Sequence, residues 1–88
     1  KTKLEVSFFD RVGDDFIRSC TTIRKEDGSC AQGTTLDRSS PAYCNLMNGM
    51  DYIGEVTLYG KCYFPKYAPI KNKEGRVIGA ICIGKCIS

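Results

Sequence analysis

Apolar and polar residues alternate near the start of the chain, where Leu4, Val6 and Phe8 are separated by polar residues. A period of two residues is typical of a strand that buries one face, so residues 4–9 are predicted to form a strand. Residues 16–23 are rich in β-branched side chains and predict a second strand. Because aspartates and a glycine lie between the two segments, we expect them to form a hairpin.

A polar segment with two glycines follows at residues 24–37 and has no sustained period, so it predicts a connecting loop. A short helix is predicted after this loop. Ser40 is a favourable N-cap, Pro41 stands at the first helical position, and Gly49 is a C-terminal stop. The helix should therefore have about two turns.

Three further strands are predicted at residues 51–60, 61–70 and 76–84, the last two joined by a polar Lys-Asn-Lys-Glu-Gly turn. Sequential strands on either side of one helical segment favour an α+β domain built on a single five-stranded antiparallel sheet.

The last predicted strand is apolar on both faces, which alternation would divide into Val77, Ile81 and Ile83 on one and Ile78, Ala80 and Cys82 on the other. Both faces then need cover. One short helix and one loop can cover only one of them. We expect the other face to pack against a segment outside this chain, such as a flanking helix, or against another subunit.

The composition of the 88-residue chain bounds its function. This length corresponds to one domain. Its 13 basic and 10 acidic residues are interspersed and give a net charge of +3, which argues against a nucleic-acid partner. No apolar run is long enough to span a membrane. The chain has no histidine, which removes Ser-His and Cys-His nucleophile pairs and the commonest metal ligand. We therefore expect no enzymatic activity, no metal site and no cofactor.

Five stretches of the chain, in this order and spacing, resemble one family of sensor domains: DDFIRSCTTIRKEDGS, GTTLDRSSPAY, GEVTLYGKCYFPKYAPI, KEGRVIGAICIG and KCIS. The family is the extracytoplasmic Cache sensor domains of bacterial chemoreceptors and sensor kinases. The match is to the single-Cache, PAS-like type found in methyl-accepting chemotaxis proteins.

This resemblance implies a PAS-like sheet with a ligand pocket between one sheet face and the loop-helix segment. A long N-terminal helix, missing from this chain, would cover the opposite face. The chain would then be the periplasmic or extracellular part of an inner-membrane receptor for a small solute such as a short organic acid or amino acid. It would be attached to the membrane through segments outside this chain, and would form a homodimer through flanking or swapped elements. The alternative is a small secreted binding or inhibitor protein stabilised by disulfides.

Arg18 is the first candidate ligand-binding residue, because it lies mid-strand between apolar neighbours, where an unpaired cation is costly. It would need a salt bridge, a water channel or an anionic ligand. The alternative is that Arg18 lies on a strand face exposed to solvent and binds no ligand. On a regular strand, Ser19 and Thr21 would point away from Arg18. The other candidates have side chains that suit a carboxylate, although tyrosines are commonly packing residues; they are Tyr43, Tyr52, Lys61, Tyr63 and Tyr67.

Six cysteines in so short a chain favour an oxidising compartment, and none belongs to the family motif. If the hairpin turns near residues 72–75, residues whose numbers sum to roughly 145–148 lie opposite each other on its two strands. Cys62 and Cys86 should therefore lie close together, and they are the first candidate disulfide. Cys30 and Cys44 are a second candidate disulfide, because their loop and helix should lie close together. Buried thiols are the alternative for all six, since small cores bury free cysteine readily.

Overall fold

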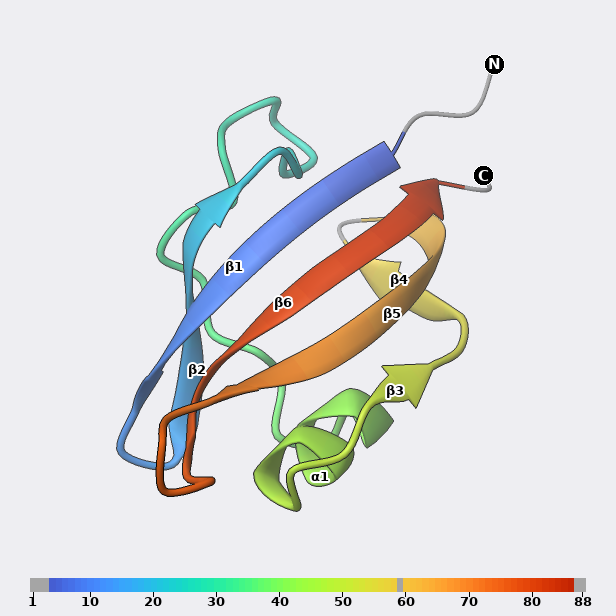
Figure 1. The fold of residues 1–88 in the computed structure, drawn as a ribbon. Helices are drawn as coiled ribbons and strands as arrows, with labels where there is room; N and C mark the ends of the chain where they lie inside the picture. The colour runs from blue at the N-terminus through green and yellow to red at the C-terminus, as the bar shows by residue number, and fades with distance from the viewer. Residues whose placement is uncertain (1–3, 59, 87–88) are drawn as a thin grey trace.

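The computed structural model describes residues 4–58 and 60–86 and has an antiparallel sheet as its main element (Figure 1). The strands lie in the order β2-β1-β6-β5-β3, and β4 also pairs with β5. Their bounds are β1 Leu4–Val12, β2 Asp15–Thr21, β3 Tyr52–Ile53, β4 Val56–Leu58, β5 Lys61–Lys71 and β6 Val77–Cys86. One helix, α1, spans Pro41–Met47. The predicted α+β class is confirmed.

The predicted strand at residues 51–60 is divided into β3 and β4, which pair with β5 in one continuous register. The sheet therefore has six strands, although they occupy the five predicted positions. The break at Gly54 lies opposite Pro65, which has no backbone N–H to donate to the ladder. A Cβ atom at Gly54 would also lie only 2.5 Å from the Tyr52 hydroxyl oxygen, so a larger residue there would require the Tyr52 side chain to move.

Helix α1 begins and ends where the sequence predicts. The Ser40 hydroxyl accepts a hydrogen bond from the backbone N–H of Ala42 at 3.2 Å, as an N-cap does. Gly49 follows the helix with a φ of +74°, a left-handed conformation that favours glycine. The loop after β2 passes behind that strand to reach α1 (Figure 1).

The main core lies between the inner face of the sheet, α1 and the loop. Its buried members come from four strands, the loop and the helix, and are Phe9, Phe16, Leu36, Ala42, Leu46, Tyr67, Val77, Ala80 and Cys82. The expected division of the last strand was wrong at its start. The register shifts between Ile70 and Lys71, so Val77 packs in the core with Ala80 and Cys82, and Ile78 is exposed.

The outer face of the sheet is apolar and exposed in this chain. Its exposed side chains come from β1, β3, β5 and β6, and include Leu4, Phe8, Ile53, Phe64, Ile78 and Ile83. The prediction that the last strand is apolar on both faces is confirmed, and the cover of its outer face stays a prediction. Within the described residues no helix is long and apolar enough to cross a membrane.

Candidate functional site

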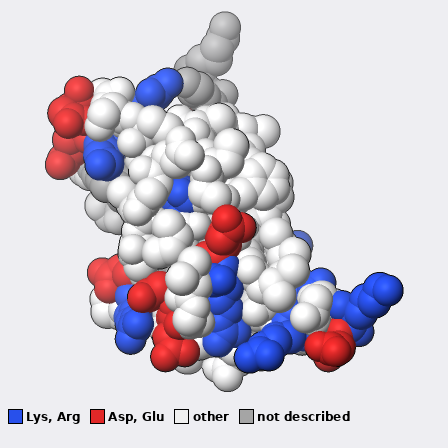
Figure 2. All heavy atoms as spheres, turned by 90° about the vertical axis from the view of Figure 1, so that its left-hand side faces the viewer, with Lys and Arg blue, Asp and Glu red and all other residues white. Residues whose placement is uncertain are grey.

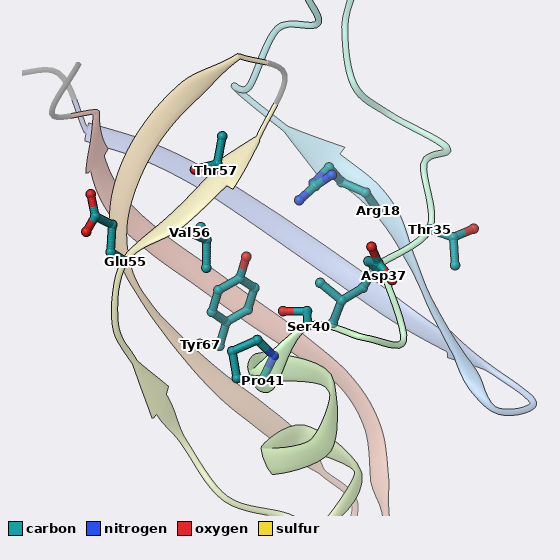
Figure 3. A pocket seen from close by; sticks show the side chains of 10 residues that line it. Arg18, Thr35, Asp37, Ser40, Pro41, Glu55, Val56, Thr57 and Tyr67 are labelled. Atoms are coloured by element: carbon teal, nitrogen blue, oxygen red, sulfur yellow. The ribbon is translucent and has the colours of Figure 1, made fainter.

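A cavity of about 420 Å³ lies between the inner sheet face and the loop-helix segment (Figure 3). Its volume is within the range of about 300–1,000 Å³ that is common for small-molecule sites. The lining residues come from β2, the loop, α1, the β3–β4 link, β4 and β5. They are Arg18, Thr35, Leu36, Asp37, Ser40, Pro41, Glu55, Val56, Thr57 and Tyr67.

Arg18 is the most deeply buried charged group of this cavity, with only 2% of its surface exposed. Its Nε donates a hydrogen bond to Ser7 Oγ at 3.1 Å, and its Nη1 donates one to Thr34 Oγ1 at 2.8 Å. The guanidinium carbon lies 4.7 Å from the centre of the Phe9 ring. Among the described residues no carboxylate lies within salt-bridge distance of Arg18. The cation is therefore held by neutral groups, which is costly in a buried position unless an anion completes the site.

A β-bulge brings Thr21 to the inner face, where Arg18 lies. Phe8 pairs with Cys20 and Phe9 pairs with Arg18, so Ser19 is an extra residue on β2. The extra residue changes the alternation, and Arg18 and Thr21 both reach Ser7. The expectation that Thr21 points away from Arg18 was wrong, because it assumed a regular strand. Bulges that redirect a side chain in this way are common beside functional sites.

The bulge also completes a row of polar side chains across the inner face. Neighbouring strands pair Thr21 with Ser7, Ser7 with Cys82, Cys82 with Tyr67, and Tyr67 with Tyr52. The hydroxyls of Thr21 and Ser7 are 2.7 Å apart, and the rings of Tyr67 and Tyr52 have centres 6.2 Å apart. Arg18 joins this polar row through its hydrogen bond to Ser7. The row of hydroxyl and thiol side chains therefore connects to the floor of the cavity.

Cys82 and Tyr67, the central members of the polar row, are neutral at neutral pH, and burial raises the pKa of both further above that range. Burial raises the pKa of the Cys82 thiol to about 11, and burial together with the adjacent Cys82 raises the pKa of Tyr67. Neither group is therefore an anion at neutral pH. Because of this, neither can serve as the counter-ion of Arg18, although both lie near it.

Two carboxylates that the sequence analysis did not select also line the cavity. Asp37 accepts hydrogen bonds from the Ser39 backbone N–H at 2.9 Å and from Ser39 Oγ at 2.8 Å, which lower the pKa of its carboxyl. Glu55 lies between β3 and β4. The Asp-x-Ser sequence before the helix indicates a turn, but only the folded loop shows that it borders the Arg18 cavity.

The predicted site residues separate into two groups. Arg18 and Tyr67 line the cavity together, and both point into it (Figure 3). The other candidates do not line it. Tyr52 packs on Tyr67, and Tyr43 donates a hydrogen bond to the Asp14 carbonyl. Tyr63 is buried nearer the start of β5, and Lys61 is exposed at the first position of that strand.

The two predicted disulfides differ in how much of each the structure describes. Cys30 and Cys44 are unbridged thiols in this structure. The side chain of Cys86 lies outside the described part of the chain, and its backbone pairs with Tyr63, one position from Cys62. The Cys62–Cys86 bridge therefore stays a prediction. Among the side chains that the structure describes, no group of three acidic or cysteine residues could hold a metal ion.

Charges of both signs are interspersed on the side of the molecule that carries β2 and its following loop (Figure 2). One such pair is Arg38 with Asp15, whose Nε and Oδ1 are 2.9 Å apart. This face has no extended field of one sign, unlike the clustered basic surface of a typical nucleic-acid-binding protein.

Comparison with known proteins gives one family. The model of the Cache 3/Cache 2 fusion domain matches residues 2–87, nearly the whole chain. No curated protein and no solved structure matches the chain.

Proposed function

The chain belongs to the Cache 3/Cache 2 fusion domain family, whose members are extracellular sensor domains of bacterial receptors, and we propose that its Arg18 cavity binds a small anionic solute. The solute would be a short organic acid or an amino acid bound through its carboxylate. We propose that the chain is one sensor domain of a longer inner-membrane receptor, of the methyl-accepting chemotaxis or sensor-kinase type, facing the periplasm or the exterior.

The observation that supports this function is the buried charge of Arg18. Its guanidinium has partners for Nε and Nη1 in Ser7 and Thr34, yet it has no ion pair among the described residues. A planar guanidinium is well suited to a carboxylate, which forms short charge-assisted hydrogen bonds with it. Its side chain and the Tyr67 hydroxyl point into the same space (Figure 3), so one bound carboxylate can contact both.

Thermal unfolding in the presence of short organic acids and amino acids tests the proposal. A ligand at 100 times its dissociation constant stabilises the folded state by about 2.7 kcal/mol. Arg18→Met should abolish the shift, because methionine fills the space without the charge. Arg38→Met is the matched control: it also removes one positive charge, but Arg38 lies on the surface beside Asp15 and not in the cavity. An unchanged shift in folded Arg18→Met would contradict the proposal.

The exposed outer face suggests how the domain is assembled in the receptor. We propose that a helix preceding this domain covers that face, and that paired receptors form a homodimer through such flanking elements. Phe8 and Ile83 are exposed on the face, 42% and 45% respectively. Analytical ultracentrifugation of the isolated chain should show self-association that decreases in the Phe8→Ser, Ile83→Ser double variant. Equal self-association of the unmodified chain and the double variant would contradict the proposal.

A further inference from the structure

We propose that Asp37 determines the charge class of the ligand: the cavity accepts a solute with one carboxylate and rejects a solute with two. This inference rests on the proposed function, because it assumes that Arg18 receives the first carboxylate. It adds a second determinant, which acts on the part of the solute that lies away from Arg18.

The charges that line the cavity are unequal. Arg18 is its one cation among the lining residues, whereas Asp37 and Glu55 are both acidic. A single ligand carboxylate balances Arg18. A second carboxylate has no cation left among the lining residues and must lie near an acidic side chain instead, where repulsion between like charges opposes binding. A neutral or positively charged group meets no such repulsion.

Asp37 is the acidic residue placed to act on the ligand. It lies on the loop immediately before α1 and borders the cavity between Arg18 and Ser40 in Figure 3. The two hydrogen bonds from Ser39 fix its carboxylate and favour its charged form. Asp37 therefore stays negative over the pH range in which short carboxylic acids are themselves ionised.

Glu55 provides a matched comparison. It borders the same cavity and carries the same charge, but its carboxylate is directed away from Arg18 and Tyr67 (Figure 3). A simple change in the overall charge of the site would affect Asp37→Asn and Glu55→Gln equally. A direct effect of the Asp37 carboxylate on the bound solute would appear only in Asp37→Asn.

Isothermal titration calorimetry with acids of equal chain length tests the inference. Butyrate is compared with succinate, and propionate with malonate, on the unmodified chain and on both variants. The unmodified chain should bind each monocarboxylate at least about tenfold more tightly than its dicarboxylate partner. Asp37→Asn should reduce this preference about fivefold or more, chiefly by improving dicarboxylate binding, and Glu55→Gln should leave it unchanged. Asparagine keeps the oxygen that accepts the Ser39 hydrogen bonds, so the loop should retain its fold.

The outcomes separate this inference from the proposed function. If dicarboxylates bind as well as monocarboxylates, and Arg18→Met abolishes both, the function stands and the charge selection is wrong. Equal effects of Asp37→Asn and Glu55→Gln would also overturn the role of Asp37. If neither class of acid binds the folded chain, the proposed function itself fails, and the selection fails with it.

Discussion

Ser7 and Arg18 are joined by a hydrogen bond inside the core: Arg18 Nε donates to Ser7 Oγ at 3.1 Å, and Ser7 is completely buried. The same Ser7 oxygen lies 2.7 Å from Thr21 Oγ1. A serine in the central part of β1 thus links the guanidinium of the candidate site to the polar row that crosses the sheet. Its hydroxyl is the acceptor that allows Arg18 Nε to be buried.

Replacing Ser7 with alanine should therefore destabilise the protein. Ser7→Ala leaves Arg18 Nε without its acceptor in the core, and an unsatisfied buried donor costs about 1–3 kcal/mol. Urea unfolding followed by circular dichroism measures the change. The control is Ser19→Ala, whose hydroxyl donates to the Phe8 carbonyl in an exposed position. A loss from Ser7→Ala no larger than that from Ser19→Ala would contradict the assignment.

Alkaline pH should weaken the fold through Cys82. The folded state raises the pKa of this thiol from its usual value of 9 to about 11, so the folded state holds the proton more tightly than the unfolded state. The stabilisation is complete below about pH 9 and is lost as the pH rises towards 11, with a total on the order of 2 kcal/mol. Tyr67, whose pKa burial also raises, adds to the loss in the same direction at higher pH.

Urea midpoints measured between pH 8 and 11 under reducing conditions check this pH dependence. In Cys82→Ala the midpoint should fall less steeply between pH 9 and 10 than in the unmodified chain. The slope is the informative quantity, because the substitution also changes the packing and hence the absolute stability. Identical slopes would show that Cys82 does not carry the effect.

Thiol-reactive reagents should distinguish the cysteines by exposure. Cys20 and Cys44 are exposed, whereas Cys82 is 3% exposed. Since the thiolate is the reacting species, burial and a raised pKa both slow the reaction of Cys82. We expect a fast phase of thiol labelling in the unmodified chain, and this phase should disappear in the Cys20→Ala, Cys44→Ala double variant. Modification of Cys82, followed by mass spectrometry, should occur only with denaturant; rapid labelling of it in the folded state would contradict the structure.

Gly79 should tolerate no larger residue, because β1 and β6 approach closely there. A Cβ atom added at Gly79 would collide with the Phe9 carbonyl oxygen, a backbone atom that cannot rotate away. Gly79→Ala must separate the two strands and should cost more than about 2 kcal/mol. Ile78→Ala, at the adjacent exposed position, should have a much smaller effect in the same unfolding experiment. Similar losses from both variants would argue against this approach of the strands.

Much of the fold follows from local sequence. The alternation in β1, the Ser-Pro start and glycine stop of α1, and the polar turn between β5 and β6 each specify nearby backbone geometry, and all were predicted. The pocket on the loop-helix side was implied by the family resemblance. Arg18 and Tyr67 could also be selected from their residue type and strand position, since both combine a polar end with apolar surroundings.

The sequence by itself thus determined most of the elements, the hairpins between neighbouring strands and the presence of a second apolar sheet face, because these depend on short-range periodicity and turn chemistry. The pairing of β1 with β6 joins distant parts of the chain and came only from the tertiary structure. Only the tertiary structure decided which side chains lie on each face of the sheet. The extra residue at Ser19 turns Thr21 toward Ser7, which Arg18 also contacts, and the register shift after Ile70 moves Val77 into the core. The tertiary structure also brings Asp37, on the loop before α1, to the Arg18 cavity. Bulges and loop packing depend on contacts between residues far apart in the chain, which no local pattern specifies.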